Sequence, residues 1–453
     1  MNVVREQIKS VKQVLSIQEV DSAKTYRPAA FCMLTEVDGQ DIAYNTLTGE
    51  IAELTEKEAG LLREKEIAFC EEASELVKKW YLVPVEHDDI QLSDEIEAFV
   101  KLFEKEDGIS SYTIFPTMDC NARCFYCFEN GRQKMPMSEQ TAKDVVEYIC
   151  KNAPSDKKVK IAWFGGEPLY NARVIDIITS GLKEKGIEFA STIVSNGFLF
   201  NDELVSHAKN DWNLKQAQIT LDGEEETYNT VKAYIDADGK NPFLVVTDNI
   251  EKLVLADIKV NIRLNMGEHN KEELFSLVEW LGKRFAGEKK PNVYAHLLFE
   301  YEKTGVSVEK HIAAAKALSM LEQRCFELGF SHVEPVRKEV RLNHCMADSD
   351  RAITILPTGK LGKCEHYSDD EFVGDIYSGI TDKAKVAEFA ERVVPKELCN
   401  DCPAYPQCIR LKKCNTNVLA PCDVARRMLA KHKLEIQAKY TYRKLKEKET
   451  KAE

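Results

Sequence analysis

The sequence lacks every feature that would place the chain in or across a membrane. No stretch holds about 18 apolar residues in succession, the length that a membrane-spanning helix needs. The amino-terminal stretch "MNVVREQIKSVKQVLSIQEV" alternates charged and apolar residues, and it has neither an apolar signal core nor a small-residue cleavage site. We therefore expect a cytoplasmic protein with no membrane partner.

Positive charge and low-complexity sequence are also scarce. The 62 Lys and Arg residues are outnumbered by 75 Asp and Glu residues, and the only basic cluster is the tail "YRKLKEKETK". Because phosphate neutralisation dominates affinity for nucleic acids, we expect no nucleic-acid partner. What remains is an ordinary globular composition, 44% apolar and 30% charged, and the length of 453 residues predicts several domains.

Cysteine, by contrast, is abundant. In a reduced cytoplasm, 14 cysteines are expected to bind metal rather than to form disulfides. Ten of them fall in two clusters, one from Cys120 to Cys127 and one from Cys345 to Cys422. The other four stand alone, and we interpret them as small buried side chains: Cys32, Cys70, Cys150 and Cys325.

Short β-rich runs alternate with helical patterns between residues 111 and 301. The six runs are "SYTIFPT", "VKIAWFGG", "ASTIVSNG", "LKQAQITLDG", "IKVNIRLNM" and "NVYAHLLFEY". They predict an α/β fold with a parallel sheet covered by helices, and six units indicate a partial (β/α)6 TIM-like barrel rather than a closed barrel of eight strands. Unusual residues cluster where these strands end: Cys120, Gly165, Gly166, Glu167, Ser195, Asn196, Asp222 and Arg263. The carboxyl edge of the sheet is therefore the predicted site, and Asp222 is interpreted either as structural or as a support for the residues of the site.

Residues 27–105 have a different pattern. Asp38 and Gly39 mark a hairpin turn, and Thr55 followed by Glu58 predicts a capped helix. A small domain of this kind either captures an extended peptide at an open sheet edge or caps the barrel, and the sequence leaves both interpretations open.

The first cysteine cluster supplies three thiols from one loop, Cys120, Cys124 and Cys127. A closed structural zinc site takes four protein ligands, and no histidine lies nearby to complete it. An iron–sulfur cluster of four irons that is held by three cysteines instead keeps one iron free to bind a small-molecule chelate. The iron–sulfur interpretation is favoured, and zinc is the alternative.

The loop "CNARCFYC" resembles the signature loop of the radical S-adenosylmethionine (SAM) enzymes. In that family SAM chelates the open iron, and its reductive cleavage gives a 5'-deoxyadenosyl radical that abstracts hydrogen from the substrate. "GGEP" resembles the motif that contacts the methionyl amino group, "SNG" the ribose-binding strand end, and "NIRLNM" the strand whose arginine pairs with the methionyl carboxylate. The resemblance therefore implies seven SAM-binding residues: Tyr126 beside the adenine, Gly165, Gly166, Glu167, Ser195, Asn196 and Arg263.

The second cysteine group resembles the SPASM extension of this superfamily, which carries two auxiliary four-iron clusters. By that resemblance Cys399, Cys402, Cys408 and Cys422 hold one cluster, and Cys345, Cys364 and Cys414 hold the other. The second set is one ligand short, so either Cys325 completes it or a substrate thiol binds the open iron. The expected cofactors are SAM and three [4Fe-4S] clusters, and a zinc ribbon is the alternative for this block.

SPASM proteins with a small amino-terminal domain resemble maturases of ribosomally made peptides, in which that domain, the RiPP recognition element, binds the leader. The resemblance implies five regions: a leader-binding domain (1–105), a radical SAM partial barrel (106–305), a helical bridge (306–344), a SPASM domain (345–425) and a charged terminal helix (426–453).

The function that this resemblance implies is oxidative peptide modification. We expect a sactipeptide or ranthipeptide type of enzyme that forms a thioether between a cysteine sulfur and a carbon of the precursor peptide, with Glu365 as catalytic base and a flavodoxin or ferredoxin as electron donor. The alternatives are carbon–carbon cyclophane formation, formylglycine formation and a non-enzymatic zinc-binding protein.

Overall fold

The computed structural model describes residues 1–103, 107–287, 289–298, 307–330, 335–340, 345–366, 370–395, 397–414 and 422–452. The expected region boundaries at residues 105, 305 and 344 lie outside these ranges, and so does the end of the strand that was expected to reach Tyr301. No helix in the described part of the chain is both long and apolar enough to cross a membrane.

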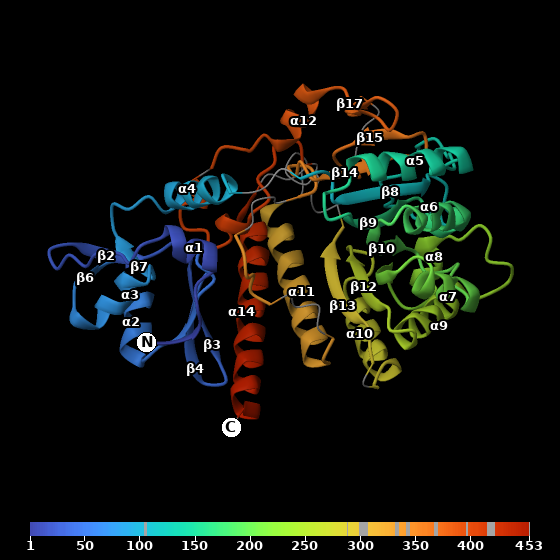
Figure 1. Cartoon of the computed structure of the whole chain (residues 1–453). Coiled ribbons are helices and arrows are strands. Elements are labelled where there is room, and N and C mark those ends of the chain that lie inside the picture. The colour runs from blue at the N-terminus through green and yellow to red at the C-terminus, as the bar shows by residue number, and fades with distance from the viewer. Residues whose placement is uncertain are drawn as a thin grey trace.

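The six predicted strands are all present and lie side by side in one parallel sheet. They are β8 (Ser111–Thr117), β9 (Lys158–Gly165), β10 (Glu188–Ser195), β11 (Leu214–Thr220), β12 (Lys259–Met266) and β13 (Asn292–Leu297). The helices that connect them are α5 (Glu139–Asn152), α6 (Ala172–Glu184), α7 (Asp202–Asn210), α8 (Glu225–Lys232), α9 (Pro242–Leu255) and α10 (Glu273–Arg284). These helices cover one face of the sheet (Figure 1).

Alternation along each strand decides which side chains enter the core. Ile161 and Trp163 of β9 and Ile262 and Leu264 of β12 are buried in one cluster with the helices. Residues between them, such as Arg263, lie on the opposite face of the sheet because successive strand side chains point in opposite directions. That face is where polar side chains can gather without disturbing the core.

The sheet continues into the carboxyl-terminal region through β14 (Ala352–Ile355), β15 (Lys360–Gly362), β16 (Gly374–Asp375) and β17 (Gly379–Ile380). β14 pairs in parallel with β8, so the region that was expected to form a separate SPASM domain shares a sheet with the βα region. The strand order is β13-β12-β11-β10-β9-β8-β14-β15-β16-β17. The outer strands β13 and β17 do not pair, and the described residues form an open α/β sheet rather than a closed barrel.

Residues 1–103 form two small sheets with helices around them. One contains β1 (Asn2–Arg5), β3 (Cys32–Val37), β4 (Gln40–Asn45) and β5 (Ile51–Glu53), and the other contains β2 (Thr25–Pro28), β6 (Ile67–Ala68) and β7 (Leu82–Pro84). The helices are α1 (Lys9–Val14), α2 (Glu56–Arg63), α3 (Ser74–Lys78) and α4 (Asp89–Lys101). The predicted hairpin turn is confirmed, since Asp38 and Gly39 both have positive φ. The predicted cap is confirmed as well, because Thr55 and Glu58 form a reciprocal capping box at α2.

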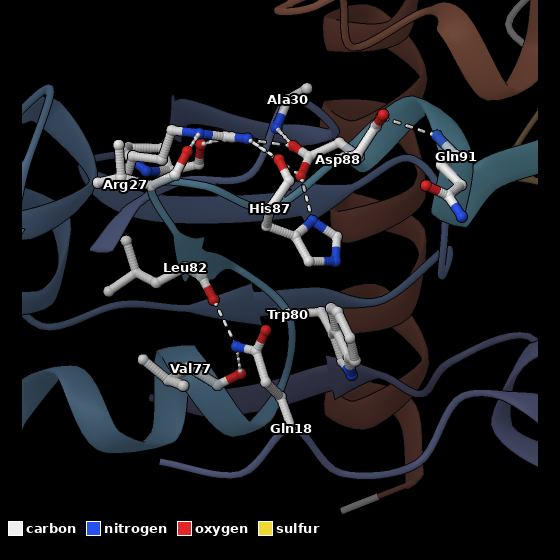
Figure 2. Close-up of polar contacts among 12 residues, drawn as sticks. Gln18, Arg27, Ala30, Val77, Trp80, Leu82, His87, Asp88 and Gln91 are labelled. Carbon is white, nitrogen blue, oxygen red and sulfur yellow. Dashed lines mark hydrogen bonds and ion pairs between the residues drawn. The ribbon is translucent and has the colours of Figure 1, made fainter. Parts of the chain in front are cut away.

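Buried polar contacts fix the start of α4. Asp89 is buried and accepts hydrogen bonds from the Arg27 guanidinium at 3.0 Å and the Ala30 amide at 2.5 Å. The Nδ1 atom of His87 lies 2.7 Å from the same carboxylate, and Asp88 caps the first turn of the helix (Figure 2). These contacts hold α4 against the two small sheets.

The terminal helix joins distant parts of the chain. The charged helix expected from residue 426 is α14 (Val424–Ala452), and it lies between β3 and α11 (Val308–Glu327) (Figure 1). Leu434, Ala438 and Tyr442 are buried with Met33 of β3 in one apolar cluster. The helix therefore fastens the amino-terminal sheet to the rest of the molecule.

Candidate active site

The loop that follows β8 carries the three clustered cysteines. Its ends are held together by the Met118 amide, which donates to the Met135 carbonyl at 2.8 Å. Inside the loop the Cys127 amide donates to the Cys124 carbonyl at 3.1 Å, which closes a tight turn. Burial raises the pKa of Cys120 to about 12, and the thiols of Cys124 and Cys127 lie close enough to raise it further. The structure thus brings the three predicted ligands together.

Two glycines allow this loop to pass directly against the end of β9. A Cβ added to Gly166 would lie 2.2 Å from the Asp119 carbonyl oxygen, and one added to Gly165 would lie 2.4 Å from the Thr117 carbonyl oxygen. The approach is held by the Glu167 amide, which donates to the Asp119 carbonyl at 2.8 Å. The glycine pair is therefore needed for the position of the cysteine loop.

Glu167 lies in the interior and braces the ends of β9 and β10. One carboxylate oxygen accepts a hydrogen bond from the Ser195 hydroxyl at 2.9 Å, and the other accepts one from the Asn196 amide at 2.8 Å. Burial raises the pKa of Glu167 to about 7, although these hydrogen bonds oppose the rise. The Asn196 side chain reaches the cysteine loop, with Nδ2 2.8 Å from Asn121 Oδ1 and 3.8 Å from Cys120 Sγ. These three predicted residues form one connected group behind the loop.

Tyr126, between the second and third cysteines, is held by its hydroxyl group. The phenol donates to Asp222 at 2.6 Å, and Lys232 Nζ donates to the phenol oxygen at 2.9 Å. The ion pair between Lys232 and Asp222, at 2.7 Å, is almost completely buried. Although burial opposes a charge here, the carboxylate holds the pKa of Lys232 above its usual value. Lys232 was not predicted from the sequence, because a lysine in a helical segment gives no sign of its role until its partner Asp222 is known.

Arg263 of β12 lies at the same edge of the sheet. Its Nε donates to Asn265 Oδ1 at 2.9 Å, and Asn265 Nδ2 donates to Asp222 at 2.9 Å. Burial, and then the nearby Arg263 charge, lowers the pKa of His296 on the neighbouring strand to about 4. The predicted arginine therefore belongs to the same hydrogen-bonded network as Tyr126.

Three cysteines of the carboxyl-terminal region form a second group. Burial and the adjacent Glu365 raise the pKa of Cys364 to about 12. The thiols of Cys345 and Cys414 lie close enough to Cys364 to raise this pKa further. Cys325 is instead buried in the core on α11, where Glu322 is the charged group that affects it.

The remaining four cysteines form a third group. Burial and the thiol of Cys422 raise the pKa of Cys408 to about 11, and Cys402 and Cys399 add to this rise. The seven carboxyl-terminal cysteines therefore lie in two groups, one of three thiols and one of four.

An aromatic contact joins the first two thiol groups. Phe128, which follows the first cysteine cluster, packs against the His366 imidazole with ring centroids 4.2 Å apart. His366 is two residues beyond Cys364. Burial lowers the pKa of the His366 imidazole, and the nearby Arg263 charge lowers it as well. One oxygen of Glu365 is buried beside this contact and has no hydrogen-bond partner among the described residues. This contact therefore brings together the segments that follow the two thiol groups.

A family model for the Radical SAM superfamily matches residues 114–281. This region of the chain is similar to radical SAM enzymes. The match runs from β8 into α10 and includes the three-cysteine loop, the glycine pair and Arg263. The chain is an enzyme.

Curated relatives are similar to parts of the chain. The GTP 3',8-cyclase of Lactiplantibacillus plantarum is 30% identical over 179 residues, which cover 38% of this chain and 52% of the cyclase. The radical SAM cyclopropyl synthase TigE of Paramaledivibacter caminithermalis is 24% identical over 186 residues, 35% of this chain and 39% of that protein. The chain spans between 41% and 53% of the length of the curated relatives that it matches first.

A solved structure shares the fold over a longer range. Native anSMEcpe with bound AdoMet and Kp18Cys peptide has a TM-score of 0.54 and 15% sequence identity, and the match covers 74% of this chain and 98% of that one. At this identity the likeness concerns the fold alone.

The chemistry of the donor set at the cysteine loop fits the iron–sulfur cluster of radical SAM enzymes. Cys120, Cys124 and Cys127 offer three thiolates from one loop, and thiolates are the ligands of iron–sulfur clusters. Among the residues that the structure describes, no three His, Cys, Asp or Glu side chains are arranged to hold a single metal ion. In such a cluster each of the three thiolates would bind a different iron.

Proposed function

We propose that this enzyme is a peptide maturase that forms a thioether between a cysteine sulfur and a carbon of a ribosomally made precursor peptide. The contact of Phe128 with His366 carries this proposal, because it joins the three-cysteine loop to the group that contains Cys364. A substrate in front of the loop would then lie close to a second set of thiols. A reaction that needs both SAM and an electron acceptor would use such an arrangement.

The proposed cofactors follow from the three thiol groups. Each group would hold one [4Fe-4S] cluster: Cys120, Cys124 and Cys127 the SAM-binding cluster, Cys345, Cys364 and Cys414 the first auxiliary cluster, and Cys399, Cys402, Cys408 and Cys422 the second. SAM would lie at the sheet edge near Tyr126, Gly166, Asn196 and Arg263. Because Glu167 and Ser195 are buried and bonded to each other, we assign them to shaping this edge.

Thioether formation sets three chemical demands. The new carbon–sulfur bond replaces one C–H bond and one S–H bond, so the carbon loses a hydrogen atom, the sulfur loses a proton and one electron is left over. The loop of Cys120, Cys124 and Cys127 would hold the cluster that, with SAM, would supply the radical for the hydrogen atom. The proton needs a base, and the electron needs an acceptor near the substrate.

We assign the base to Glu365 and the acceptor to the first auxiliary site. One Glu365 oxygen has no hydrogen-bond partner in the described residues, and Glu365 directly follows Cys364, so we assign it to accept the proton of the substrate thiol. Three thiols lie nearby, those of Cys345, Cys364 and Cys414. A four-iron cluster held by these three thiols would keep one ligand position for the sulfur of the substrate. Cys325 is buried on α11 and is not assigned to this site.

The amino-terminal region is proposed to bind the leader of the precursor. Its larger sheet has β1 and β3 as outer strands, and an extended peptide can add to such an edge. The region is also fastened to the third cysteine group. Tyr405 packs beside Phe31 in its core, with ring centroids 6.4 Å apart, and Arg410 pairs with Asp94 of α4 at 3.0 Å. A leader bound there would be tied to the cluster-bearing region.

The similar proteins bear on the substrate in different ways. The anSMEcpe structure that shares the fold contains a peptide, which agrees with a peptide substrate. Two GTP 3',8-cyclases match this chain over 53% and 52% of their own length. GTP is therefore a competing substrate that the same experiment should include.

The test is an anaerobic incubation of the reconstituted enzyme with SAM, reduced flavodoxin or ferredoxin, and the cysteine-containing peptide encoded beside it. We expect the peptide to lose two hydrogens and one cysteine to become resistant to alkylation. Loss of two hydrogens with every thiol still alkylatable would instead indicate a carbon–carbon cross-link. A cyclised product from GTP, or formylglycine in place of cysteine, would contradict the thioether proposal.

The Glu365→Gln variant tests the assignment of the base. We expect it to retain peptide-independent formation of 5'-deoxyadenosine and to lose at least about tenfold in the rate of thioether formation. Glu391→Gln is the matched control, because Glu391 is an exposed carboxylate paired with Lys412 at 3.0 Å. Equal rates in both variants would remove Glu365 from the mechanism.

A further inference from the structure

The buried ion pair between Lys232 and Asp222 is part of a hydrogen-bond network in which every donor of the ammonium group has a partner. The Lys232 ammonium has three donors and uses them on Asp222 at 2.7 Å, Tyr126 at 2.9 Å and Thr220 Oγ1 at 2.6 Å. One Asp222 oxygen also accepts from Tyr126, and the other accepts from Asn265. The Asp222 side chain is fully buried and that of Lys232 is 3% exposed. The side chains of Lys232, Asp222 and Tyr126 are therefore each fixed by at least two others.

This network touches the predicted SAM site at two separate points. Tyr126 lies between two of the three cysteines, so the hydrogen bonds of its phenol to Asp222 and Lys232 anchor the cysteine loop. The Arg123 amide adds a second anchor, since it donates to the Lys232 carbonyl at 2.8 Å. On the other side, Asn265 accepts from Arg263 Nε at 2.9 Å while it donates to Asp222. A contact through Nε fixes the plane of a guanidinium group.

We propose that Asp222 and Lys232 are positioning residues for SAM, because they hold the cysteine loop through Tyr126 and orient Arg263 through Asn265. The methionyl group of SAM would contact the cysteine loop at one end and Arg263 at the other. The relative position of these two partners would then be set before SAM binds. Such preorganisation lowers the entropy that binding must remove. The inference rests on the assignment of SAM to this edge of the sheet and not on the identity of the substrate.

Two variants test this role in the reconstituted full-length enzyme without any peptide. Tyr126→Phe removes only the anchored hydroxyl. The double variant Asp222→Asn with Lys232→Met removes both buried charges together, so neither is left unpaired. The readouts are the dissociation constant of SAM, the change that SAM causes in the EPR signal of the reduced cluster, and the iron content.

We expect both variants to keep the iron content of the wild type. The dissociation constant of SAM should rise about tenfold in Tyr126→Phe, which loses the hydrogen bonds of the phenol to Asp222 and Lys232, and further in the double variant. The SAM-dependent EPR change should shrink in parallel. Tyr112→Phe is the matched control, because the Tyr112 hydroxyl is buried on β8 without a hydrogen-bond partner in the described residues, and it should leave all three readouts unchanged.

Wild-type SAM affinity and EPR response in both variants would overturn the proposal. Loss of the cluster in Tyr126→Phe would overturn it as well, since the phenol would then serve cluster assembly rather than SAM. Neither result depends on a peptide product, so failure here is distinguishable from failure of the thioether proposal.

Discussion

Replacing Gly166 with alanine tests the close approach on which the arrangement of the site depends. The added Cβ would lie 2.2 Å from the Asp119 carbonyl oxygen and 2.9 Å from the Met118 carbonyl carbon, whereas ordinary contact begins near 3.4 Å. Both obstacles are backbone atoms, so no side-chain rotation relieves the overlap. Either the end of β9 or the cysteine loop must move by about 1 Å in a closely packed region.

The size of the effect follows from the contacts that this movement disrupts. The Gly166 amide donates to the Thr117 carbonyl at 3.1 Å, and the Glu167 amide donates to the Asp119 carbonyl at 2.8 Å. Losing both bonds should lower the free energy of unfolding by roughly 1–3 kcal/mol. A displacement of about 1 Å at a site that orients reactants costs on the order of 100-fold in rate. We therefore expect Gly166→Ala to fold and to cleave SAM about 100-fold more slowly than the wild type.

The assay is the rate of 5'-deoxyadenosine formation with dithionite and SAM, together with a denaturant unfolding curve. Gly287→Ala is the control, because a Cβ there meets nothing within 4 Å, and we expect it to match the wild type. A Gly166→Ala enzyme with the wild-type rate and unfolding midpoint would refute the reasoning, since the loop could not then lie against β9 as described.

Three further predictions concern buried groups. Lys232→Met leaves Asp222 charged and unpaired, so the free energy of unfolding, measured in denaturant, should fall by about 3–5 kcal/mol. Adding Asp222→Asn should restore this stability, and a failure to restore it would contradict the pairing. In an iron assay, Cys364→Ser should lose about four irons per chain. Cys325→Ala should lose none, because Cys325 is buried on α11. Loss of iron in Cys325→Ala would show that Cys325 is a ligand. Burial raises the pKa of Glu322 to about 7, and the unfolded carboxyl releases its proton at lower pH, so wild-type stability should fall as the pH rises from 5 to 8. Glu322→Gln should gain about 2 kcal/mol relative to the wild type over that interval, measured from unfolding curves at both pH values, and a constant difference would contradict the shift.

Local patterns were sufficient for the elements that their own residues define. The six strands were predicted because apolar residues recur with period two between turn and helix signals. The hairpin at Asp38 and Gly39 and the cap at Thr55 were predicted for the same reason, since each depends on residues within about four positions. The pairing of β14 with β8 was not predicted, because a short apolar run carries no information about its partner.

By itself, the sequence determined the chemistry that is available: three thiols at a strand end, a glycine pair, and seven more cysteines far along the chain. The tertiary structure alone decided which of these groups meet. Lys232 reaches Tyr126 across 106 positions of sequence, and Phe128 meets His366 across a still longer separation. Such contacts depend on how whole elements pack, and the free energy of packing is shared among many residues rather than written in any one segment.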